Sequence, residues 1–203
     1  MHDWQALRSR VRGALSLLEC EELAYWAARA PAGDALEVGH YAGLSTIVLC
    51  WCLPPRAWLV TIDHHHGDVW CDAVPIDEFE RNIAWGWRHG LDEQSVMLGI
   101  YYQPFAEAIP RLPDQSVTFV FYDADHSPEA CAEFWQCVEP KLAPRCLFLF
   151  DDADWVGGDV LRDAALAAGF KDVARYPYRR GGKGNGKEDP RTFTLATMSR
   201  GVG

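Results

Sequence analysis

A short stretch near the N-terminus, 36–46, has residue types suited to binding a charged small molecule. Its pattern is E-x-G-x-x-x-G-x-S, with Glu37, Gly39, Gly43 and Ser45 at the defined positions. Glycine lets the backbone approach a ligand closely, glutamate can pair with an ammonium group, and serine at a helix start can hydrogen-bond a carboxylate. The stretch therefore predicts a ligand with an amino-acid part, and it lacks the third glycine of the G-x-G-x-x-G dinucleotide fingerprint.

Acidic residues recur downstream, each directly after an apolar run that is typical of a buried strand. They are Asp63 after 58–62, Asp123 after 117–122, and Asp151 with Asp152 after 146–150. In open α/β sheets, ligands bind beyond the carboxyl ends of the strands, and an acid at such an end can accept hydrogen bonds from ribose hydroxyls. Asp63 is placed for that role. With the first motif, it predicts a nucleoside joined to an amino acid.

The elements that must position these residues alternate between strand and helix patterns. Strands are predicted over 35–38, 58–62, 95–98, 117–122 and 146–150, and helices over 45–53, 76–87, 104–109, 128–138 and 160–168. Strict alternation predicts a parallel sheet covered by helices on both faces. We expect one domain over 1–203, with N-terminal helices in 1–33, an α/β core in 34–169 and a β-hairpin in 170–203.

Composition limits the functional classes. The chain has 203 residues, a net charge of -10 and 49% hydrophobic residues, so we expect a globular domain that does not bind nucleic acid. We find no signal pattern and no apolar run long enough to span a membrane. The seven cysteines include no C-x-x-C pair, which favours a reducing, cytoplasmic location.

These motifs resemble those of the small class I S-adenosylmethionine-dependent methyltransferases related to catechol O-methyltransferase and to bacterial O-methyltransferases of sugars and natural products. The resemblance covers roughly 34–165. It implies a Rossmann-like methyltransferase fold with a seven-stranded, mostly parallel sheet whose last strand is antiparallel. It also implies S-adenosyl-L-methionine as cofactor. The predicted cofactor-binding residues are Glu37, Gly39, Tyr41, Gly43, Ser45, Asp63, His64, Ile100, Tyr101 and Asp123.

Within that set, the resemblance assigns individual roles. Tyr41 lies against the methionine part and Asp63 binds the ribose. Ile100 and Tyr101 flank the adenine, although the family often has Ala and Ser at these two positions. Apart from the resemblance, we expect 64–66 to form a solvated loop with one histidine, His64, near the cofactor, since three consecutive histidines cannot all face one point.

The later motifs, 121–126 and 150–152, resemble the metal-binding motifs of the family. The resemblance implies Asp123, Asp151 and Asp152 as ligands of Mg²⁺ or another divalent cation, which suits three carboxylates. The family commonly has Asn where this chain has Asp152. His126 occupies the position of a basic Lys in catechol-type enzymes, so we predict that it is the general base.

The predicted function is methyl transfer to a hydroxyl of a small acceptor. One alternative is metal-independent methylation of nitrogen or carboxylate, and another is a non-catalytic cofactor-binding protein of the same fold. The loops around 64–75, 153–158 and 179–190 should set the acceptor. The basic glycine-rich loop 179–190 is either a solvated segment or a lid. The sequence leaves open whether the protein forms a homodimer.

Overall fold

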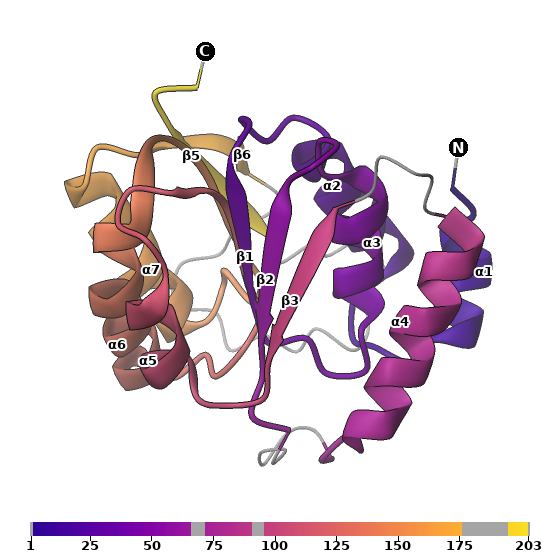
Figure 1. The fold of residues 1–203 in the computed structure, drawn as a ribbon. Coiled ribbons are helices and arrows are strands. Elements are labelled where there is room, and N and C mark those ends of the chain that lie inside the picture. The colour runs from indigo at the N-terminus through magenta and orange to yellow at the C-terminus, as the bar shows by residue number, and fades with distance from the viewer. Residues whose placement is uncertain (1, 66–71, 91–95, 176–194, 203) are drawn as a thin grey trace.

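The computed structural model describes residues 2–65, 72–90, 96–175 and 195–202. These form one seven-stranded sheet with strand order β3-β2-β1-β4-β5-β7-β6 (Figure 1). The strands are β1 (Asp34–Val38), β2 (Trp58–Ile62), β3 (Met97–Tyr101), β4 (Val117–Tyr122), β5 (Leu142–Phe150), β6 (Lys171–Arg175) and β7 (Ala196–Arg200). Neighbours from β3 to β5 pair in parallel, and β7 runs antiparallel to both β5 and β6. The predicted sheet is confirmed.

Helices cover both faces of this sheet. They are α1 (Trp4–Arg10), α2 (Leu17–Ala27), α3 (Leu44–Cys52), α4 (Ile76–Gly90), α5 (Phe105–Ala108), α6 (Pro128–Val138) and α7 (Val156–Ala167), with short 3-10 turns η1 (Ile109–Arg111) and η2 (Glu139–Lys141). Figure 1 shows α1–α4 on one side and α5–α7 on the other. The two faces of β4 show why: Phe119 and Phe121 join one buried cluster, while Val120 and Tyr122 join the other.

Local sequence signals explain where several helices start and end. At α2, the Ser16 side chain accepts a hydrogen bond from the Glu19 backbone, and Glu19 bonds back to the Ser16 backbone, which is a capping box. At α6, the Ser127 side chain accepts a hydrogen bond from the Ala130 backbone N–H, and Pro128 lies in the first turn. Pro54 follows the C-cap of α3, where it prevents further helix.

Several element boundaries differ from those that the sequence predicts, and β5 begins at Leu142 where 146 was the predicted start. β3 begins at Met97 and runs through Ile100 and Tyr101, which we had placed after the strand. Because β3 is an edge strand with half-exposed residues, its apolar signal is weak. α7 begins at Val156, four residues earlier than predicted, since Gly157 and Gly158 belong to its first turn.

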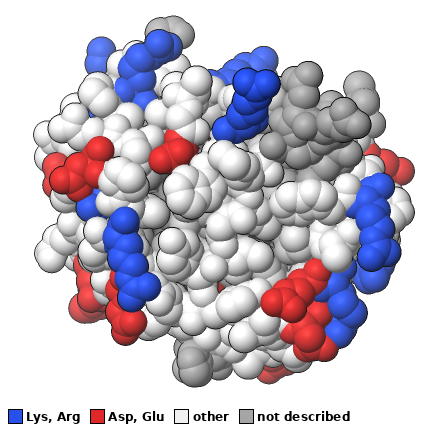
Figure 2. Space-filling model, viewed as in Figure 1, with Lys and Arg blue, Asp and Glu red and all other residues white. Residues whose placement is uncertain are grey.

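The edge and C-terminal regions complete the sheet. Met97 of β3 and Trp58 of β2 are 59% and 41% exposed. The face of the molecule that Figure 2 shows carries few charges at its centre. The hairpin strands occupy 171–175 and 196–200, whereas the predicted loop 179–190 lies outside the described residues. Within the described ranges, no helix has both the length and the apolar character to cross a membrane.

Candidate active site

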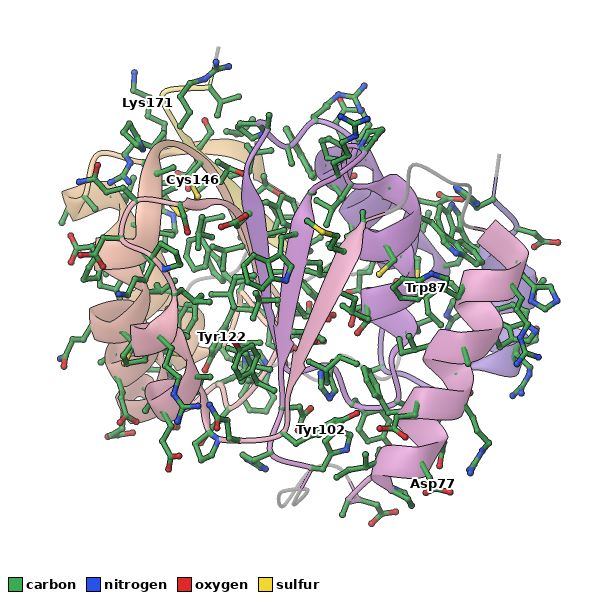
Figure 3. The ribbon with its side chains drawn as sticks, viewed as in Figure 1. Asp77, Trp87, Tyr102, Tyr122, Cys146 and Lys171 are labelled. Atoms are coloured by element: carbon green, nitrogen blue, oxygen red, sulfur yellow. The ribbon has the colours of Figure 1, made fainter. Side chains whose placement is uncertain are left out.

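The predicted site residues lie along one edge of the sheet because the backbone ladder continues one residue past each strand. Four backbone N–H groups bond to the last carbonyl of the neighbouring strand. These bonds are Asp63 to Tyr101 (3.1 Å), Gly39 to Ile62 (2.9 Å), Asp123 to Val38 (2.8 Å) and Asp151 to Tyr122 (2.9 Å). This edge is the lower one in Figure 1, and in Figure 3 the labelled Tyr102 lies there, while Cys146 and Lys171 lie toward the upper edge.

The glycines of the first motif are required by their neighbours. Gly39 has φ +88°, and a Cβ at this position would lie 1.7 Å from the backbone oxygen of Asp123. Gly43, the N-cap of α3, has φ +93° and faces Phe79 and Ile83. Gly39 therefore joins the ends of β1 and β4. Contact of either glycine with a ligand stays a prediction.

Glu37 is fully buried under this loop. Its Oε2 accepts hydrogen bonds from the Thr61 hydroxyl (2.6 Å) and the Thr46 hydroxyl (2.7 Å). Its Oε1 is buried and has no hydrogen-bond partner among the described residues. Burial raises the pKa of Glu37 to about 7, against the opposing effect of the hydroxyls of Ser45, Thr61 and Thr46. Glu37 Oε1 can therefore accept a hydrogen bond from a ligand.

Thr61 continues into a chain of two imidazoles. The Thr61 hydroxyl lies 2.7 Å from His40 Nδ1, and His40 Nε2 lies 2.7 Å from His65 Nε2. His65 Nδ1 lies 2.9 Å from the Val74 carbonyl oxygen, where it must donate. Burial lowers the pKa of His40 to about 3, although Asp63 opposes this effect.

Asp63 holds the loop through its carboxylate. Oδ2 accepts the backbone N–H groups of His40 (3.0 Å) and Tyr41 (2.9 Å), and Oδ1 accepts that of His65 (2.7 Å). Burial raises the pKa of Asp63, but His40 and these backbone donors outweigh it and lower the pKa overall. Asp63 is thus an ionised anchor that remains half-buried. Its bond to a ribose stays a prediction.

The N-terminal segment covers the loop. Arg12, between α1 and α2, pairs with Glu78 of α4 (2.7 and 3.0 Å), and its guanidinium lies 5.3 Å from the centre of the Tyr41 ring. Tyr41 is half-buried, with φ 44°. Through the ion pair and the cation–π contact, Arg12 links the N-terminal segment to α4 and to Tyr41 of the loop.

At the ends of β4 and β5, His126 lies between two carboxylates. Its Nε2 is 3.7 Å from Asp123 Oδ1 and 3.5 Å from Asp152 Oδ2. Burial lowers the pKa of His126, but Asp123 and Asp152 outweigh this and raise it overall. A Cβ at Gly157 would lie 2.2 Å from the His126 backbone oxygen, so the start of α7 fixes this residue. The arrangement is that of a base beside a carboxylate.

The third predicted metal ligand, Asp151, is buried. Burial raises its pKa well above the usual range, and the charge of Asp123 adds to the shift. Burial likewise raises the pKa of Asp152 to about 6, against the effect of His126. Glu19 of α2 is close enough to contribute to both shifts.

These carboxylates do not assemble into a cation site. Across the part of the chain that the structure describes, no group of three or more His, Cys, Asp or Glu side chains is arranged to hold a metal ion. His126 instead occupies the space between Asp123 and Asp152. The residues as placed therefore do not fit the predicted Mg²⁺, and the predicted metal site is not confirmed.

The remaining predicted cofactor residues lie at or near the same edge. Ser45 is buried at the start of α3, beside Glu37. His64 is exposed after Asp63. Ile100 and Tyr101 pack on opposite faces of β3. Their backbone atoms can therefore face one ligand together, but their side chains point to different faces of the sheet. Their roles beside an adenine stay predictions.

Sequence reasoning missed the buried chain of Thr61, His40 and His65. A signal was present, since Thr61 is a polar residue inside the apolar run 58–62 and lies opposite Glu37 in the β1–β2 register. Around the imidazoles, Phe79 stacks on His40 at 4.0 Å, and the Tyr102 ring is 5.3 Å from His65. These contacts join residues far apart in sequence, so no local pattern reveals them.

Comparisons with known proteins concern the family and the fold of this chain. A family model described as a methyltransferase domain matches residues 36–153, which is more than half of the chain. No protein in the set with curated functions matches significantly. The matched segment contains all the predicted site residues.

Solved structures with the same fold include methyltransferases with bound cofactor. The O-methyltransferase TomG of Streptomyces achromogenes, involved in tomaymycin synthesis and solved with S-adenosylmethionine, is 18% identical with a TM-score of 0.60, over 94% of this chain and 82% of that one. An O-methyltransferase of Bacillus cereus, solved with S-adenosylhomocysteine, is 14% identical with a TM-score of 0.62, over 96% and 86%. At these identities, the likeness shows the fold. Together with the family match, it shows that this chain belongs to the methyltransferase-domain family and is a class I S-adenosylmethionine-dependent methyltransferase.

Proposed function

We propose that this enzyme methylates a hydroxyl group of a small acceptor, with His126 as the general base. The observation that carries the proposal is the position of His126 Nε2 between the Asp123 and Asp152 carboxylates, on the edge that also presents the glycine loop. A base at that place can act on a hydroxyl brought next to the methyl donor. O-methyltransferases among the structural neighbours support this choice of acceptor.

The loop over Glu37 binds the cofactor in this proposal. The buried Oε1 of Glu37 accepts from the ammonium group, Ser45 at the start of α3 bonds the carboxylate, and Asp63 accepts from the ribose. Tyr41, held by Arg12, lies against the methionine part. The bound cofactor supplies an electrophilic methyl group.

At the acceptor, His126 Nε2 takes the hydroxyl proton as the oxygen becomes nucleophilic. Asp123 stabilises the imidazolium that results, because its carboxylate lies beside the ring. Tyr122 and Trp155, whose ring centres lie 6.0 and 6.1 Å from that of His126, limit the positions open to the imidazole. The remaining contribution is alignment of acceptor and donor.

No step is assigned to a metal ion. Cation assistance rests on the resemblance of Asp123, Asp151 and Asp152 to the ligands of metal-dependent relatives. The placement of His126 between two of these residues supports a base-driven reaction instead. The cytoplasmic location, a homodimer and the lack of nucleic-acid partners stay predictions.

Calorimetry with S-adenosylhomocysteine, with and without Mg²⁺, tests the cofactor part. We expect one molecule bound per chain in both conditions, and absence of binding in both would refute the proposal. A panel of small hydroxylated compounds, incubated with the enzyme and methyl-labelled cofactor and followed by mass spectrometry, tests the acceptor part. Label found only on amines or carboxylates would contradict hydroxyl methylation.

A further inference from the structure

A chain of hydrogen-bond contacts runs from Glu37 of β1 through Thr61 and His40 to His65, just after β2. Thr61 bonds Glu37 at 2.6 Å and His40 at 2.7 Å, and the two imidazoles meet at 2.7 Å. Every contact joins two groups that can each donate or accept, except at the far end. There, the Val74 carbonyl can only accept, so His65 Nδ1 must carry a proton.

Counting protons along these bonds leaves two complete arrangements. In the first, Glu37 is protonated and donates to Thr61, Thr61 donates to His40, and neutral His40 donates to neutral His65. In the second, Glu37 is ionised, the Glu37–Thr61 and Thr61–His40 bonds are reversed, and one of the two imidazoles is an imidazolium. Both arrangements contain the same number of protons.

The second arrangement places the charge on His65. His40 is 1% exposed, stacked on Phe79, and burial disfavours its charged form. His65 is half-buried, and its backbone N–H bonds the Asp63 carboxylate. Removing the proton altogether would leave two lone pairs facing each other somewhere along the chain, at a separation of 2.6 to 2.9 Å.

We propose that Glu37 and His65 share one proton through Thr61 and His40, and that a cationic group bound at Glu37 drives this proton to His65, where the protein retains it. The Glu37 proton passes to Thr61 Oγ1, the Thr61 proton passes to His40 Nδ1, and the His40 Nε2 proton passes to His65 Nε2. Glu37 then carries the negative charge that the cation needs. Thr61, His40 and His65 are positioning residues in this scheme, which rests on the proposed binding of the cofactor ammonium at Glu37.

Other groups around the chain leave this scheme intact. The titratable residues that face it are Asp63 after β2, Cys50 of α3, Tyr102 after β3 and Asp123 after β4. Burial raises the pKa of Tyr102 to about 12, and burial raises that of Cys50 further, so both stay protonated near neutral pH. Asp63 stays ionised and favours the imidazolium.

Calorimetry of S-adenosylhomocysteine binding in several buffers at pH 7 tests the proposal, because the dependence on buffer ionisation enthalpy counts the protons released. For the natural protein, we expect close to zero protons released per ligand bound. In His65→Gln, the side chain can still donate to His40 but cannot take the proton, so we expect about half a proton released per ligand from Glu37. His89→Ala, which removes an exposed imidazole of α4, should stay close to zero.

A second measurement follows the imidazoles directly. In ¹⁵N-histidine NMR spectra, S-adenosylhomocysteine should protonate both nitrogens of His65, whereas methylthioadenosine, which lacks the amino-acid part, should not. Equal proton release by the natural protein and His65→Gln, or an unchanged His65 in the complex, would overturn the shared proton. Absence of any binding heat would instead count against the proposed function itself.

Discussion

The two halves of the candidate site stabilise their buried carboxylates in different ways. At the ends of β1 and β2, Glu37 and Asp63 lie under the cofactor loop, and their oxygens accept from hydroxyls and backbone N–H groups. At the ends of β4 and β5, Asp123, Asp151 and Asp152 crowd together, with Glu19 nearby. His126 lies within 4 Å of two of these carboxylates, those of Asp123 and Asp152.

In the proposed function, this difference separates cofactor binding, at the ends of β1 and β2 (the cofactor half), from acceptor chemistry, at the ends of β4 and β5 (the acceptor half). The carboxylates of the cofactor half accept hydrogen bonds before a ligand arrives, so this half can bind the cofactor without large rearrangement. The acceptor half places one imidazole beside the Asp123 and Asp152 carboxylates, which makes that imidazole a stronger base. Preformed hydrogen bonds favour affinity, whereas a base beside carboxylates favours proton removal.

Replacing the imidazole should have the largest effect. We expect His126→Ala to lower kcat by about 10²- to 10⁴-fold, since proton removal from the acceptor loses its base. Affinity for S-adenosylhomocysteine should change little, because the cofactor half does not contain this residue. Steady-state kinetics and calorimetry measure the two quantities. A variant that retains full turnover would show that the acceptor half works without His126.

Gly39→Ala should damage the link between the halves. The new Cβ would meet the Asp123 carbonyl oxygen at 1.7 Å, at φ +88°, so we expect a loss of more than about 4 kcal/mol in the free energy of unfolding. Gly169→Ala is a matched control, with φ +86° and no atom within 4 Å, and should cost only about 1 kcal/mol. Urea denaturation of both variants makes the comparison. Similar losses would mean that the Gly39 contact is unimportant.

The pH dependence of stability should identify Glu37. The pKa of Glu37 is about 7 in the folded protein and near 4.5 when exposed, so the folded state binds more protons between these values. Stability from this group is therefore lost as pH rises from about 4.5 to 7, by up to about 3 kcal/mol.

Glu37→Gln should remove this loss. Urea denaturation at several pH values measures the free energy of unfolding. That of the variant should rise relative to that of the natural protein between pH 5 and 8. The opposing contribution of His40, whose pKa is lowered to about 3, is common to both proteins and cancels in the difference. Parallel stability curves would contradict a proton on Glu37.

Chelation should have the smallest effect. Because His126 lies between Asp123 and Asp152, we expect turnover after EDTA treatment to stay within about twofold of the untreated enzyme. Added Mg²⁺ should give the same rate. Loss of activity that Mg²⁺ restores would show that the acceptor half rearranges around a cation, as the metal-dependent relatives suggest.

Much of the fold was predictable because its signals are local. Alternating apolar runs and helix patterns specify a parallel α/β sheet, and acidic residues after 58–62, 117–122 and 146–150 mark its carboxyl edge. Edge strand β3 and the first turn of α7 were misplaced, since half-exposed residues and paired glycines give weak local signals.

By itself, the sequence determined which side chains lie at the carboxyl edge, because Glu37, Asp63, Asp123 and Asp151 lie at or just after the ends of predicted strands in a parallel sheet. Tertiary structure alone decided how their charges are balanced. Whether a carboxylate meets a hydroxyl, an imidazole or another carboxylate depends on strand register and on helices distant in sequence. Those contacts put Thr61 opposite Glu37 and His126 between two acids.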